Sequence, residues 1–343
     1  MSRLVLGALA LRPHGSGVQT YERELIHALS LLDGLPDLAA VVQEDTTATL
    51  PADVTPLPRP VCSGVRRAVE GLRPVPAALF HSLDVDLPLA QRSPTVSTVH
   101  DMSVFDTPWA MSRLRAAGEQ QLLRRSLRRA DAIIAVSEFT AERIRALTGR
   151  DSTVTPLAPA PWARIPGDAE VTRVREKYDL PERFVLQLGT LEPRKRPDVV
   201  NEALHGTGVP LVLAGGRTDS AERPAGSIGL GYVDLDDVPA LYRAATVVAY
   251  ASSYEGFGLP PVEALACGAV VVASAVGGIP EAVGSGAVVV RGLRREDWRD
   301  ALLEALNDDT HRSTLLREAE GTVGTLTWEA TARATAAVYR TLL

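Results

Sequence analysis

The chain has 343 residues, with 36 Lys and Arg against 42 Asp and Glu, which gives a formal net charge of -6. Apolar residues make up 45% and charged residues 23%, a balance that excludes a disordered or collagen-like chain. The slight acidity argues against a dedicated nucleic-acid-binding protein. The length is enough for two well-buried cores, so we expect two domains.

Cys62 and Cys267 stand far apart in the sequence, which suits reduced thiols better than a disulfide framework. No apolar stretch reaches the roughly 18 residues of a transmembrane helix, so we expect a cytoplasmic protein that touches a membrane, if at all, only peripherally at its inner face. Arg3 and the apolar run 4–11 have the outline of a signal peptide. Because its cleavage site would fall inside that run, we interpret the run as a buried first strand.

In the first half of the chain, short β-branched runs alternate with amphipathic stretches. Strands are expected at 4–11, 38–43, 78–83, 95–100, 132–137 and 153–157, and helices at 18–32, 111–129 and 140–147. The segment 44–60, with prolines at 51, 56, 58 and 60, is expected to be the least structured. This alternation predicts βαβ units and a parallel sheet covered on both faces.

The same alternation restarts at residue 184. Strands are expected at 184–188, 210–214, 228–232, 246–251, 269–273 and 287–290, and helices at 238–245, 261–267, 280–283, 295–307 and 328–343. Closely spaced prolines predict a linker near 158–172. We therefore expect an α/β fold with two Rossmann-like doubly wound domains, 1–160 and 173–325, which face a ligand cleft at the carboxyl ends of their strands. The last segment, 326–343, is expected to pack back on the first domain.

The segment 253–265 carries the most chemical information, because it follows an expected strand and opens a helix. Its glycines let the backbone approach a ligand, and free amides at a helix start favour phosphate oxygens. Glu263 is expected in the first helical turn, where its carboxylate can accept hydrogen bonds from the vicinal diol of a ribose. Glu255 adds a second carboxylate. The alternative interpretation makes Glu263 a capping acid and Glu255 a loop charge.

The run from Glu255 to Glu263 resembles the double-glutamate motif of the family 4 retaining glycosyltransferases, which have the GT-B fold. Four further segments resemble that family in order and spacing over nearly the whole chain. They are 98–101, 136–139, 189–196, and 231–233 followed by 241–245. The subgroup that the chain resembles most is that of mannosyltransferase-like enzymes of bacterial polysaccharide pathways.

The resemblance implies a catalytic set of His100, Arg194, Lys195 and Glu255. In a retaining transfer without a covalent intermediate, charge builds on the departing diphosphate, and cations aimed at it are the largest catalytic term. Arg194 and Lys195 suit that role, and an exposed basic turn is the alternative. Glu255 is implied to bind hydroxyls of the donor sugar. His100 is implied to contact that sugar near C6, with a structural histidine as the alternative.

The resemblance also implies which residues bind the rest of the donor. Glu263 would bind the ribose, and the loop 231–233 the nucleobase. The whole donor-binding set is Gly15, Ser16, Gly17, Gly189, Tyr232, Val233, Gly256, Phe257, Gly258, Leu259 and Glu263. Asp101, Ser137 and Glu138 are implied on the acceptor side, although Ser137 and Glu138 could instead cap the helix that begins near Thr140.

The sequence departs from the family pattern at two places. The usual turn after 153–156 is replaced by Leu157-Ala158-Pro159, which alters the linker, and Arg196 replaces an Asn and adds positive charge to its loop. Two Asp-x-Asp pairs, at 84–86 and 234–236, have the form of a metal site. Their surroundings favour a strand end and a helix cap instead. We therefore expect a metal-independent enzyme with no cofactor beyond its nucleoside diphosphate sugar co-substrate.

These features predict a retaining glycosyltransferase that moves a sugar, with mannose from GDP-mannose favoured, to a hydroxyl of a glycan, a lipid-linked acceptor or a small molecule. The alternatives are a GT-B phosphorylase or epimerase, and a catalytically silent nucleotide-sugar-binding partner protein. A nicotinamide-dependent oxidoreductase is disfavoured because Gly-x-Gly-x-x-Gly is missing. The Arg-rich helix 113–129 is expected to be a solvated charged face, with a surface for anionic lipid or a pyrophosphate-linked acceptor as the alternative.

Overall fold

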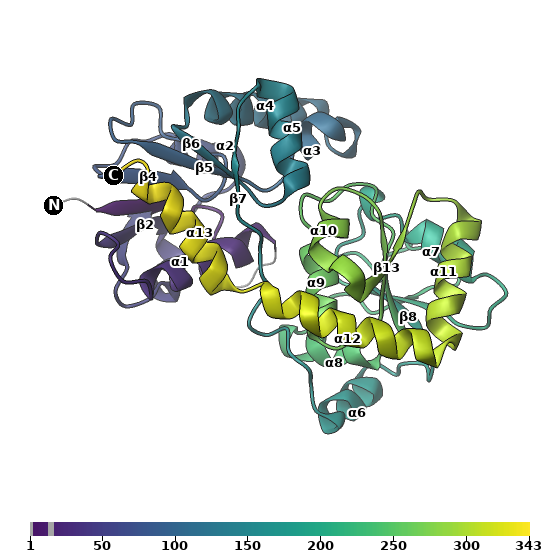
Figure 1. Cartoon of the computed structure of the whole chain (residues 1–343). Helices are drawn as coiled ribbons and strands as arrows, with labels where there is room; N and C mark the ends of the chain where they lie inside the picture. Colours follow the sequence, from purple (N-terminus) through teal and green to yellow (C-terminus); the bar gives the residue numbers. More distant parts are fainter. Residues whose placement is uncertain (1–2, 13–16) are drawn as a thin grey trace. The chain divides into compact units, whose positions relative to one another are not determined.

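The structure is a computed structural model that describes residues 3–12 and 17–343. The chain divides into two compact units (Figure 1). Unit 1 comprises Met1–Leu157 and Leu326–Leu343, and unit 2 comprises Ala158–Thr325. The last segment of the chain therefore belongs to the same unit as the first.

Unit 1 is built on a parallel sheet of seven strands in the order β3-β2-β1-β4-β5-β6-β7. The strands are β1 (Leu4–Gly7), β2 (Leu38–Gln43), β3 (Thr55–Arg59), β4 (Leu79–Ser82), β5 (Thr95–Val99), β6 (Ala132–Ala135) and β7 (Thr153–Val154). The strand order reverses between β1 and β4, so this pair forms the topological switch point, where ligands bind in open α/β sheets.

Helices cover the sheet of unit 1. They are α1 (Val18–Ser30), α2 (Gly64–Gly71), α3 (Ser103–Asp106), α4 (Arg113–Arg129), α5 (Glu138–Thr148) and α13 (Trp328–Arg340), with 3-10 turns η1 (Glu44–Thr49) and η2 (Pro108–Ala110). The C-terminal helix α13 packs along α1 (Figure 1). It does so through Ala332, Ala336 and Tyr339, which are fully buried and share one helix face by their spacing.

The expectation that 44–60 lacks regular structure was wrong, because η1 and the edge strand β3 lie there. Pro56 and Pro58 occupy alternate positions of β3, in register with Ala40 and Val42 of β2. Alternate amides of an edge strand face away from its neighbour, so a proline there removes no ladder hydrogen bond. Helix α2 was also missed, since it has only 8 residues and only Gly71 among them is buried.

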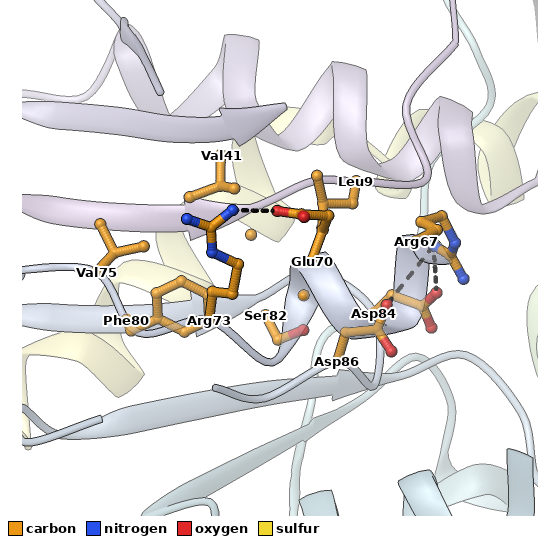
Figure 2. Close-up of a pocket in the computed structure, with 12 residues that line it drawn as sticks. Leu9, Val41, Arg67, Glu70, Arg73, Val75, Phe80, Ser82, Asp84 and Asp86 are labelled. Carbon is orange, nitrogen blue, oxygen red and sulfur yellow. Dashed lines mark hydrogen bonds and ion pairs between the residues drawn. The ribbon is translucent and has the colours of Figure 1, made fainter. Parts of the chain in front are cut away.

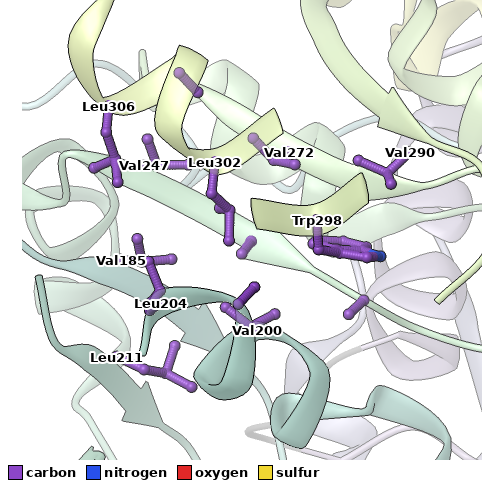
Figure 3. Packing of buried hydrophobic residues seen from close by; sticks show 14 of the residues in the cluster. Val185, Val200, Leu204, Leu211, Val247, Val272, Val290, Trp298, Leu302 and Leu306 are labelled. Carbon is purple, nitrogen blue, oxygen red and sulfur yellow. The ribbon is translucent and has the colours of Figure 1, made fainter. Parts of the chain in front are cut away.

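Unit 2 has a parallel sheet of six strands in the order β10-β9-β8-β11-β12-β13. The strands are β8 (Val185–Leu188), β9 (Leu211–Ala214), β10 (Ile228–Gly229), β11 (Val247–Tyr250), β12 (Val271–Ser274) and β13 (Ala287–Val290). The order reverses between β8 and β11. On one face of this sheet the indole of Trp298 is fully buried with Val200 and Val272 in one apolar cluster (Figure 3).

The helices of unit 2 include three that the sequence analysis did not predict, at 168–177, 197–204 and 309–325. They are α6 (Asp168–Lys177), α7 (Pro197–Leu204), α8 (Val238–Ala244), α9 (Leu259–Ala266), α10 (Ile279–Val283), α11 (Arg295–Asn307) and α12 (Asp309–Thr325), with 3-10 turns η3 (Pro193–Lys195), η4 (Leu235–Asp237) and η5 (Gly284–Gly286). The expected linker 158–172 is too long, because α6 begins at Asp168. Helix α6 buries only Val174, and α12 only Leu315 and Ala319, so neither shows the apolar stripe that identifies a helix.

None of the helices in the described part of the chain combines the length and the apolar character that crossing a bilayer requires.

Candidate functional site

At the carboxyl ends of β8 and β9, beside the switch point of unit 2, two glycines bring the loops after these strands into backbone contact. Gly189 follows β8 with φ of 140°, and its amide donates to the carbonyl of Ala214, 2.8 Å away. A Cβ on Gly215, where φ is 120°, would lie 2.6 Å from the carbonyl carbon and oxygen of Gly189. Only glycine adopts such angles readily and permits this approach. The loops after β8 and β9 therefore meet directly beside the strand ends.

The loops after β8 and β11 bring Arg194 and Glu255 together. An Nη of Arg194 donates to Oε1 of Glu255 over 2.9 Å and to the carbonyl of Tyr254 over 3.2 Å. Ser252 donates to the same Oε1 over 2.9 Å, and Nε of Arg194 bonds Glu192 over 2.9 Å. Arg194 and Glu255, which the sequence analysis assigned to different parts of the donor, thus form an ion pair, with side chains that are 28% and 19% exposed.

Backbone hydrogen bonds hold this pair in place. The amide of Ser253 donates to the carbonyl of Arg194 over 2.7 Å, and the amide of Gly278 donates to the carbonyl of Glu255 over 3.1 Å. Gln187, in β8, donates its side-chain amide to the carbonyl of Lys195 over 2.8 Å. The main chains of Arg194, Lys195 and Glu255 are therefore each held by a hydrogen bond from a neighbouring segment.

Lys195 lies over Gly189. A Cβ on Gly189 would overlap the ammonium of Lys195, so the lysine head group sits against the end of β8. Its positive charge also acts on Glu263. The guanidinium of the neighbouring Arg196 is paired with a carboxylate, because two of its nitrogens donate to Asp198 over 3.0 and 2.6 Å. The expected additional positive charge of this loop is therefore balanced by Asp198.

Glu263 lies one turn deeper in its helix than expected. Helix α9 begins at Leu259, so Glu263 is its fifth residue and lies in the second turn. It is 7% exposed. Burial raises the pKa of Glu263 to about 8, and the amide of Ala160 and the charge of Lys195 offset this only in part. The side chain is a buried carboxyl group next to the cationic loop, not a helix cap.

The remaining donor-side residues of unit 2 differ in what they present. Phe257, Leu259 and Val233 are buried, so only their backbone can face a ligand. Tyr232 is 76% exposed, and its ring is available for stacking. Its loop is tied to the same sheet end, because the amide of Gly215 donates to the carbonyl of Gly231 over 2.7 Å.

Gly256 and Gly258 lie in the loop before α9. Gly258 is the residue before the first turn of α9 and has φ of 110°. A Cβ at this position would approach Ile279 to 3.0 Å. The loop 251–258 therefore runs close to the start of α10, and the start of α9 needs a glycine.

In unit 1, His100 follows β5 and has a defined hydrogen-bond pattern. Its Nε2 donates to the carbonyl of Leu83 over 2.8 Å. Its ring meets that of Tyr21 edge-on, with centroids 4.7 Å apart. Because a carbonyl can only accept, Nε2 carries a proton, and Nδ1 is the ring nitrogen left to face other partners.

A buried chain of hydrogen bonds stands behind His100, and the sequence did not indicate it. Tyr21 shares a hydrogen bond with Thr98 over 2.8 Å, and Thr98 shares one with Nε2 of His81 over 2.8 Å. Nδ1 of His81 meets the hydroxyl of Tyr339 over 2.6 Å. Burial, and secondarily the nearby His100, lowers the pKa of His81 to about 3, so that ring is neutral. The one sequence signal was a histidine inside an apolar strand.

The three residues predicted on the acceptor side take local structural positions. Asp101 accepts the amide of Ser103 over 2.8 Å. Ser137 caps α5 by accepting the amide of Thr140 over 3.0 Å, and the helix begins at Glu138. Gly15 and Ser16 lie outside the described residues. Gly17 is the residue before α1, with φ of 64°.

A small hollow with room for about one water molecule lies between α2 and the sheet of unit 1, at its switch point (Figure 2). Gly7, Leu9, Val41, Val75 and Phe80 form its apolar part, and Arg67, Glu70, Arg73, Asp84 and Asp86 its charged part. An Nη of Arg67 lies 3.7 Å from Asp84 and 3.8 Å from Asp86. The sequence analysis noted Asp84 and Asp86 only as a strand end and did not single out Arg67.

The second Asp-x-Asp pair is structural. Lys177 of α6 binds Asp234 over 2.7 Å and Asp237 over 2.6 Å, and Arg173 binds Asp237 over 2.7 Å. These bonds join η4 to α6. The expected helix cap is absent, since Asp237 makes no side-chain capping bond to α8. Across residues 3–12 and 17–343, no cluster of three or more His, Cys, Asp or Glu is arranged to hold a metal ion.

Some of the arginines of α4 are engaged within unit 1. Arg125 donates to the carbonyls of Leu87 and Pro88 over 2.5 and 2.8 Å, and the guanidinium of Arg124 lies 4.9 Å from the ring centre of Phe105. These contacts use part of the positive charge of the helix for packing.

Comparisons with known proteins agree on the family. Residues 168–321 match the family model described as Glycosyl transferases group 1, and residues 16–158 match that of Glycosyltransferase Family 4. The chain is 31% identical over 297 residues to O-antigen chain mannosyltransferase B of Escherichia coli, which covers 81% of this chain and 78% of that protein. It is 32% identical to D-inositol 3-phosphate glycosyltransferase of Mycobacterium bovis over 74% of this chain and 57% of that longer protein.

Solved structures agree on the fold. Sucrose-phosphate synthase from Thermosynechococcus elongatus superposes with a TM-score of 0.77 at 22% identity, covering 100% of this chain and 99% of that one. HepE of Anabaena in complex with UDP-glucose superposes with a TM-score of 0.75 at 16% identity, covering 100% of both chains. Both of these proteins share the two-sheet α/β architecture of the chain.

Proposed function

The chain belongs to the family 4 glycosyltransferases with the GT-B fold, and on that premise we propose that it moves a sugar from a nucleoside diphosphate sugar to an acceptor hydroxyl with retention of the anomeric configuration. The observation that carries this proposal is the pair Arg194 and Glu255 at the switch point of unit 2, with Lys195 beside it. These three groups match the two halves of such a donor, since cations suit a diphosphate and a carboxylate suits sugar hydroxyls.

Donor binding rearranges the charges of this pair. Diphosphate oxygens compete with Glu255 for the guanidinium of Arg194, because both are anions that match its forked donors. When Arg194 turns to the diphosphate, Glu255 retains Ser252 as a donor and gains capacity to accept hydrogen bonds from sugar hydroxyls. The pair therefore keeps both side chains ordered before the donor arrives, which lowers the entropic cost of binding.

Arg194 and Lys195 then stabilise the departing diphosphate. The bond between the anomeric carbon and the phosphate oxygen breaks, and its electron pair stays on the diphosphate. Cations already aimed at that charge need no reorganisation, and removing one such group typically costs about 10²–10³ in kcat. We propose that this charge makes a metal ion or a further cofactor unnecessary. The acceptor oxygen attacks the face that the diphosphate leaves, and the proton of the acceptor hydroxyl passes to the departing phosphate oxygen.

Glu263 and His100 complete the proposal for the donor. Glu263 accepts hydrogen bonds from the hydroxyls of the ribose. These hydrogen bonds take the place of those that water would make to an exposed carboxylate. Nδ1 of His100 takes a hydroxyl of the donor sugar. The exposed ring of Tyr232 stacks on the nucleobase.

The favoured donor is GDP-mannose. Its support is the Escherichia coli relative, a mannosyltransferase whose match covers 81% of this chain. The acceptor in this proposal is a glycan, a lipid-linked glycan or a small polyhydroxylated molecule.

A thermal-shift screen against GDP-, UDP-, ADP- and dTDP-sugars tests donor binding, because a ligand that binds the folded chain raises its melting temperature by mass action. We expect one base to dominate and Lys195→Ala to abolish its shift. NMR of the product then gives its anomeric configuration, and an inverted product would contradict retention.

The same assays separate the alternatives. A phosphorylase would cleave a glycoside only with added phosphate, and an epimerase would isomerise the nucleotide sugar with no acceptor. A silent partner protein would bind the donor saturably and transfer it to nothing. An unshifted melting temperature with every nucleotide sugar would overturn the proposed donor site.

A further inference from the structure

The buried hydrogen-bond chain of unit 1 joins four elements of that unit. Tyr339 lies in α13, His81 in β4 and Thr98 in β5. Tyr21, in α1, completes the chain through its hydrogen bond of 2.8 Å with Thr98. All four side chains are fully buried. The chain therefore connects two helices to two neighbouring strands of the sheet.

The end of this chain lies against His100. His100 comes two residues after Thr98, and side chains two positions apart along a strand point to the same face of the sheet. Tyr21 contacts both residues, because its hydroxyl bonds Thr98 and its ring meets the imidazole edge-on, with 4.7 Å between the centroids. On its other contact, Nε2 of His100 donates to the carbonyl of Leu83 over 2.8 Å. The imidazole is thus held at two places, by a carbonyl and by the ring of Tyr21.

The hydroxyl of Tyr21 determines how its ring is oriented. The hydrogen bond to Thr98 fixes the far end of the phenol, and without this bond only packing would hold the ring. Trp328, the first residue of α13, lies beside the same ring, with 6.2 Å between the centroids. This distance is typical of interacting aromatic pairs. The hydroxyl of Thr98 therefore orients the aromatic ring that packs on His100.

Thr98 depends in turn on His81 and Tyr339. The hydroxyl of Thr98 lies 2.8 Å from Nε2 of His81, and the hydroxyl of Tyr339 lies 2.6 Å from Nδ1 of the same ring. Burial, and secondarily His100, lowers the pKa of His81 to about 3. The ring is therefore neutral and has one donor and one acceptor nitrogen, each with its own partner. Loss of either partner would leave a buried nitrogen unpaired, which costs free energy.

The cost of burying these polar groups indicates what they do. Each polar atom of the chain has a hydrogen-bond partner, and a buried polar group is tolerated only when it is paired. Ala332 and Ala336 show that α13 packs elsewhere through apolar side chains alone. A paired buried network holds its members in one arrangement. Because His100 is partly exposed, the network fixes a side chain that can reach a ligand.

We propose that Tyr21 and Tyr339 are positioning residues, which hold the imidazole of His100 in the orientation that binds the donor sugar. Tyr21 acts through its ring. Tyr339 acts from the other end of the chain, through His81 and Thr98. Helix α13 is then part of the functional site of unit 1 and not only a cover for α1. The inference rests on the proposed function for the role of His100, whereas the orientation of the imidazole is measurable without any sugar.

Phenylalanine variants of the full chain test this inference, because they remove one hydroxyl and keep the ring. Tyr21→Phe breaks the hydrogen bond to Thr98, and Tyr339→Phe breaks the chain at its other end. Ser126→Ala is the matched control. Its hydroxyl shares a hydrogen bond of 2.7 Å with Ser97 of β5, and both serines are fully buried. Ser97 points to the opposite face of the sheet from Thr98, so the control removes a buried hydrogen bond from the same strand without touching the chain. Melting curves verify that each variant is folded.

The first measurement is the selectivity for the sugar hydroxyl that His100 binds. kcat/KM is compared for the identified donor and for analogues that each lack one sugar hydroxyl, and His100→Ala shows which hydroxyl no longer matters. We expect that hydroxyl to contribute about tenfold in the original chain, as one hydrogen bond does. Tyr21→Phe should lower this selectivity by about threefold or more, and Tyr339→Phe by a smaller factor. Ser126→Ala should keep it.

The same selectivity measured in a second background separates positioning from general destabilisation. Since the tyrosines are proposed to act only through His100, either Phe substitution should leave the selectivity unchanged in a chain that already carries His100→Ala. A loss of packing or stability would lower turnover in both backgrounds.

Nitrogen NMR of the imidazole is the second measurement and needs no sugar. In a chain labelled with ¹⁵N-histidine, the ring signals of His100 are assigned by their loss in His100→Ala, and they show which nitrogen carries the proton. We expect Nε2 to be protonated in the original chain and in Ser126→Ala. Tyr21→Phe should give a mixture of tautomers, because a ring that turns leaves the carbonyl of Leu83 for part of the time.

The outcomes separate this inference from the proposed function. An unchanged selectivity and imidazole spectrum in Tyr21→Phe, an equal change in Ser126→Ala, or a loss of selectivity that persists without His100 overturns the inference. An unchanged Tyr339→Phe overturns the part assigned to α13. Imidazole spectra that change in both Phe variants, together with normal turnover in His100→Ala, would instead overturn the proposed role of His100 and leave the positioning standing.

Discussion

The switch points of the two sheets carry opposite kinds of side chain. In unit 2, the loop after β8 carries Arg194 and Lys195, and the loop after β11 carries Glu255. Arg194 and Glu255 form an ion pair over 2.9 Å. In unit 1, the loop after β4 places Asp84 and Asp86 at the corresponding point, with only Arg67 facing them. The switch point of unit 2 therefore carries two cationic side chains, and that of unit 1 carries two carboxylates.

The comparison teaches that the fold supplies the position and the loops supply the chemistry. Both sheets are parallel and reverse their order once, which opens a crevice at the strand ends in each. Each crevice also keeps one buried acid whose pKa is raised, Glu263 to about 8 and Asp86 to about 7. The two differ in what compensates that acid: Lys195 acts on Glu263, whereas Arg67 is shared between two carboxylates.

Removing the cation of unit 2 is the strongest way to break this contrast. We expect Lys195→Ala to lower donor turnover by about 10²–10³, because charge on the departing diphosphate loses one of its two cations. Arg196→Gln, at the next residue, should change turnover by no more than about twofold, since Asp198 already binds that guanidinium. Initial rates with a saturating donor check both, and equal losses would show that the loop acts only through its total charge.

The buried acid of unit 2 gives a second test, through the dependence of stability on pH. The pKa of Glu263 rises from 4.5 to about 8 on folding, so the folded chain binds more protons than the unfolded chain between these values. Stability from this group is therefore complete below about pH 4.5 and is lost as the pH rises toward 8, by at most about 1.4 kcal/mol per pH unit.

Glu263→Gln should flatten that part of the stability profile, and melting temperatures between pH 4.5 and 9 measure it. Glu202→Gln, an exposed acid of α7 in the same unit, should leave the profile unchanged. A profile that Glu263→Gln does not alter would mean that the Glu263 carboxyl group is ionised in the folded chain. Added nucleotide should reduce the slope in the original chain, because ribose hydroxyls stabilise the charged form.

A smaller effect is expected at the glycine that supports Glu255. Gly277 has φ of 59°, and a Cβ there would overlap the carbonyl of Glu255, whereas Gly292 has φ of 78° and open space around it. Both substitutions to Ala strain the backbone, but only Gly277→Ala must also move the loop of Glu255. We expect it to destabilise the chain by about 1–3 kcal/mol more than Gly292→Ala and to lower turnover several-fold. The free energy of unfolding in urea and the initial rate are measured for both variants. Equal values for the two would show that the loop of Glu255 adjusts to the added Cβ without loss of stability or turnover.

Much of the fold was predictable because buried parallel strands have strong local signals. The apolar runs around Leu186, Val212, Val248 and Val272 each became a strand, and their alternation with helices indicated the doubly wound architecture. The family membership inferred from the run between Glu255 and Glu263 is confirmed by the comparisons. The elements that were missed, such as β3, α2, α6 and α12, have few buried residues or contain prolines, so periodicity carries little information about them.

The candidate site was only partly predictable. Motif spacing placed Arg194, Lys195 and Glu255 at strand ends. The position of Glu263 within its helix depends on where α9 begins, and the two consecutive prolines there are compatible with starts that differ by one turn. Residues that meet through packing had no sequence signal. Arg67 in α2 and Asp86 after β4 are separated by 19 positions, and His81 and Tyr339 by 258.

The sequence by itself determined the class of the molecule: two parallel sheets, two sets of loops at strand ends, and the cationic and acidic residues of the donor loops. Those properties follow from the order of apolar and polar residues along short segments, because that local pattern determines which segments form strands, helices and loops. Only the tertiary structure decided which charges pair, which acids are buried and that the first sheet ends in an acidic hollow. Burial and pairing depend on segments distant in the chain, and their energies exist only once those segments pack together.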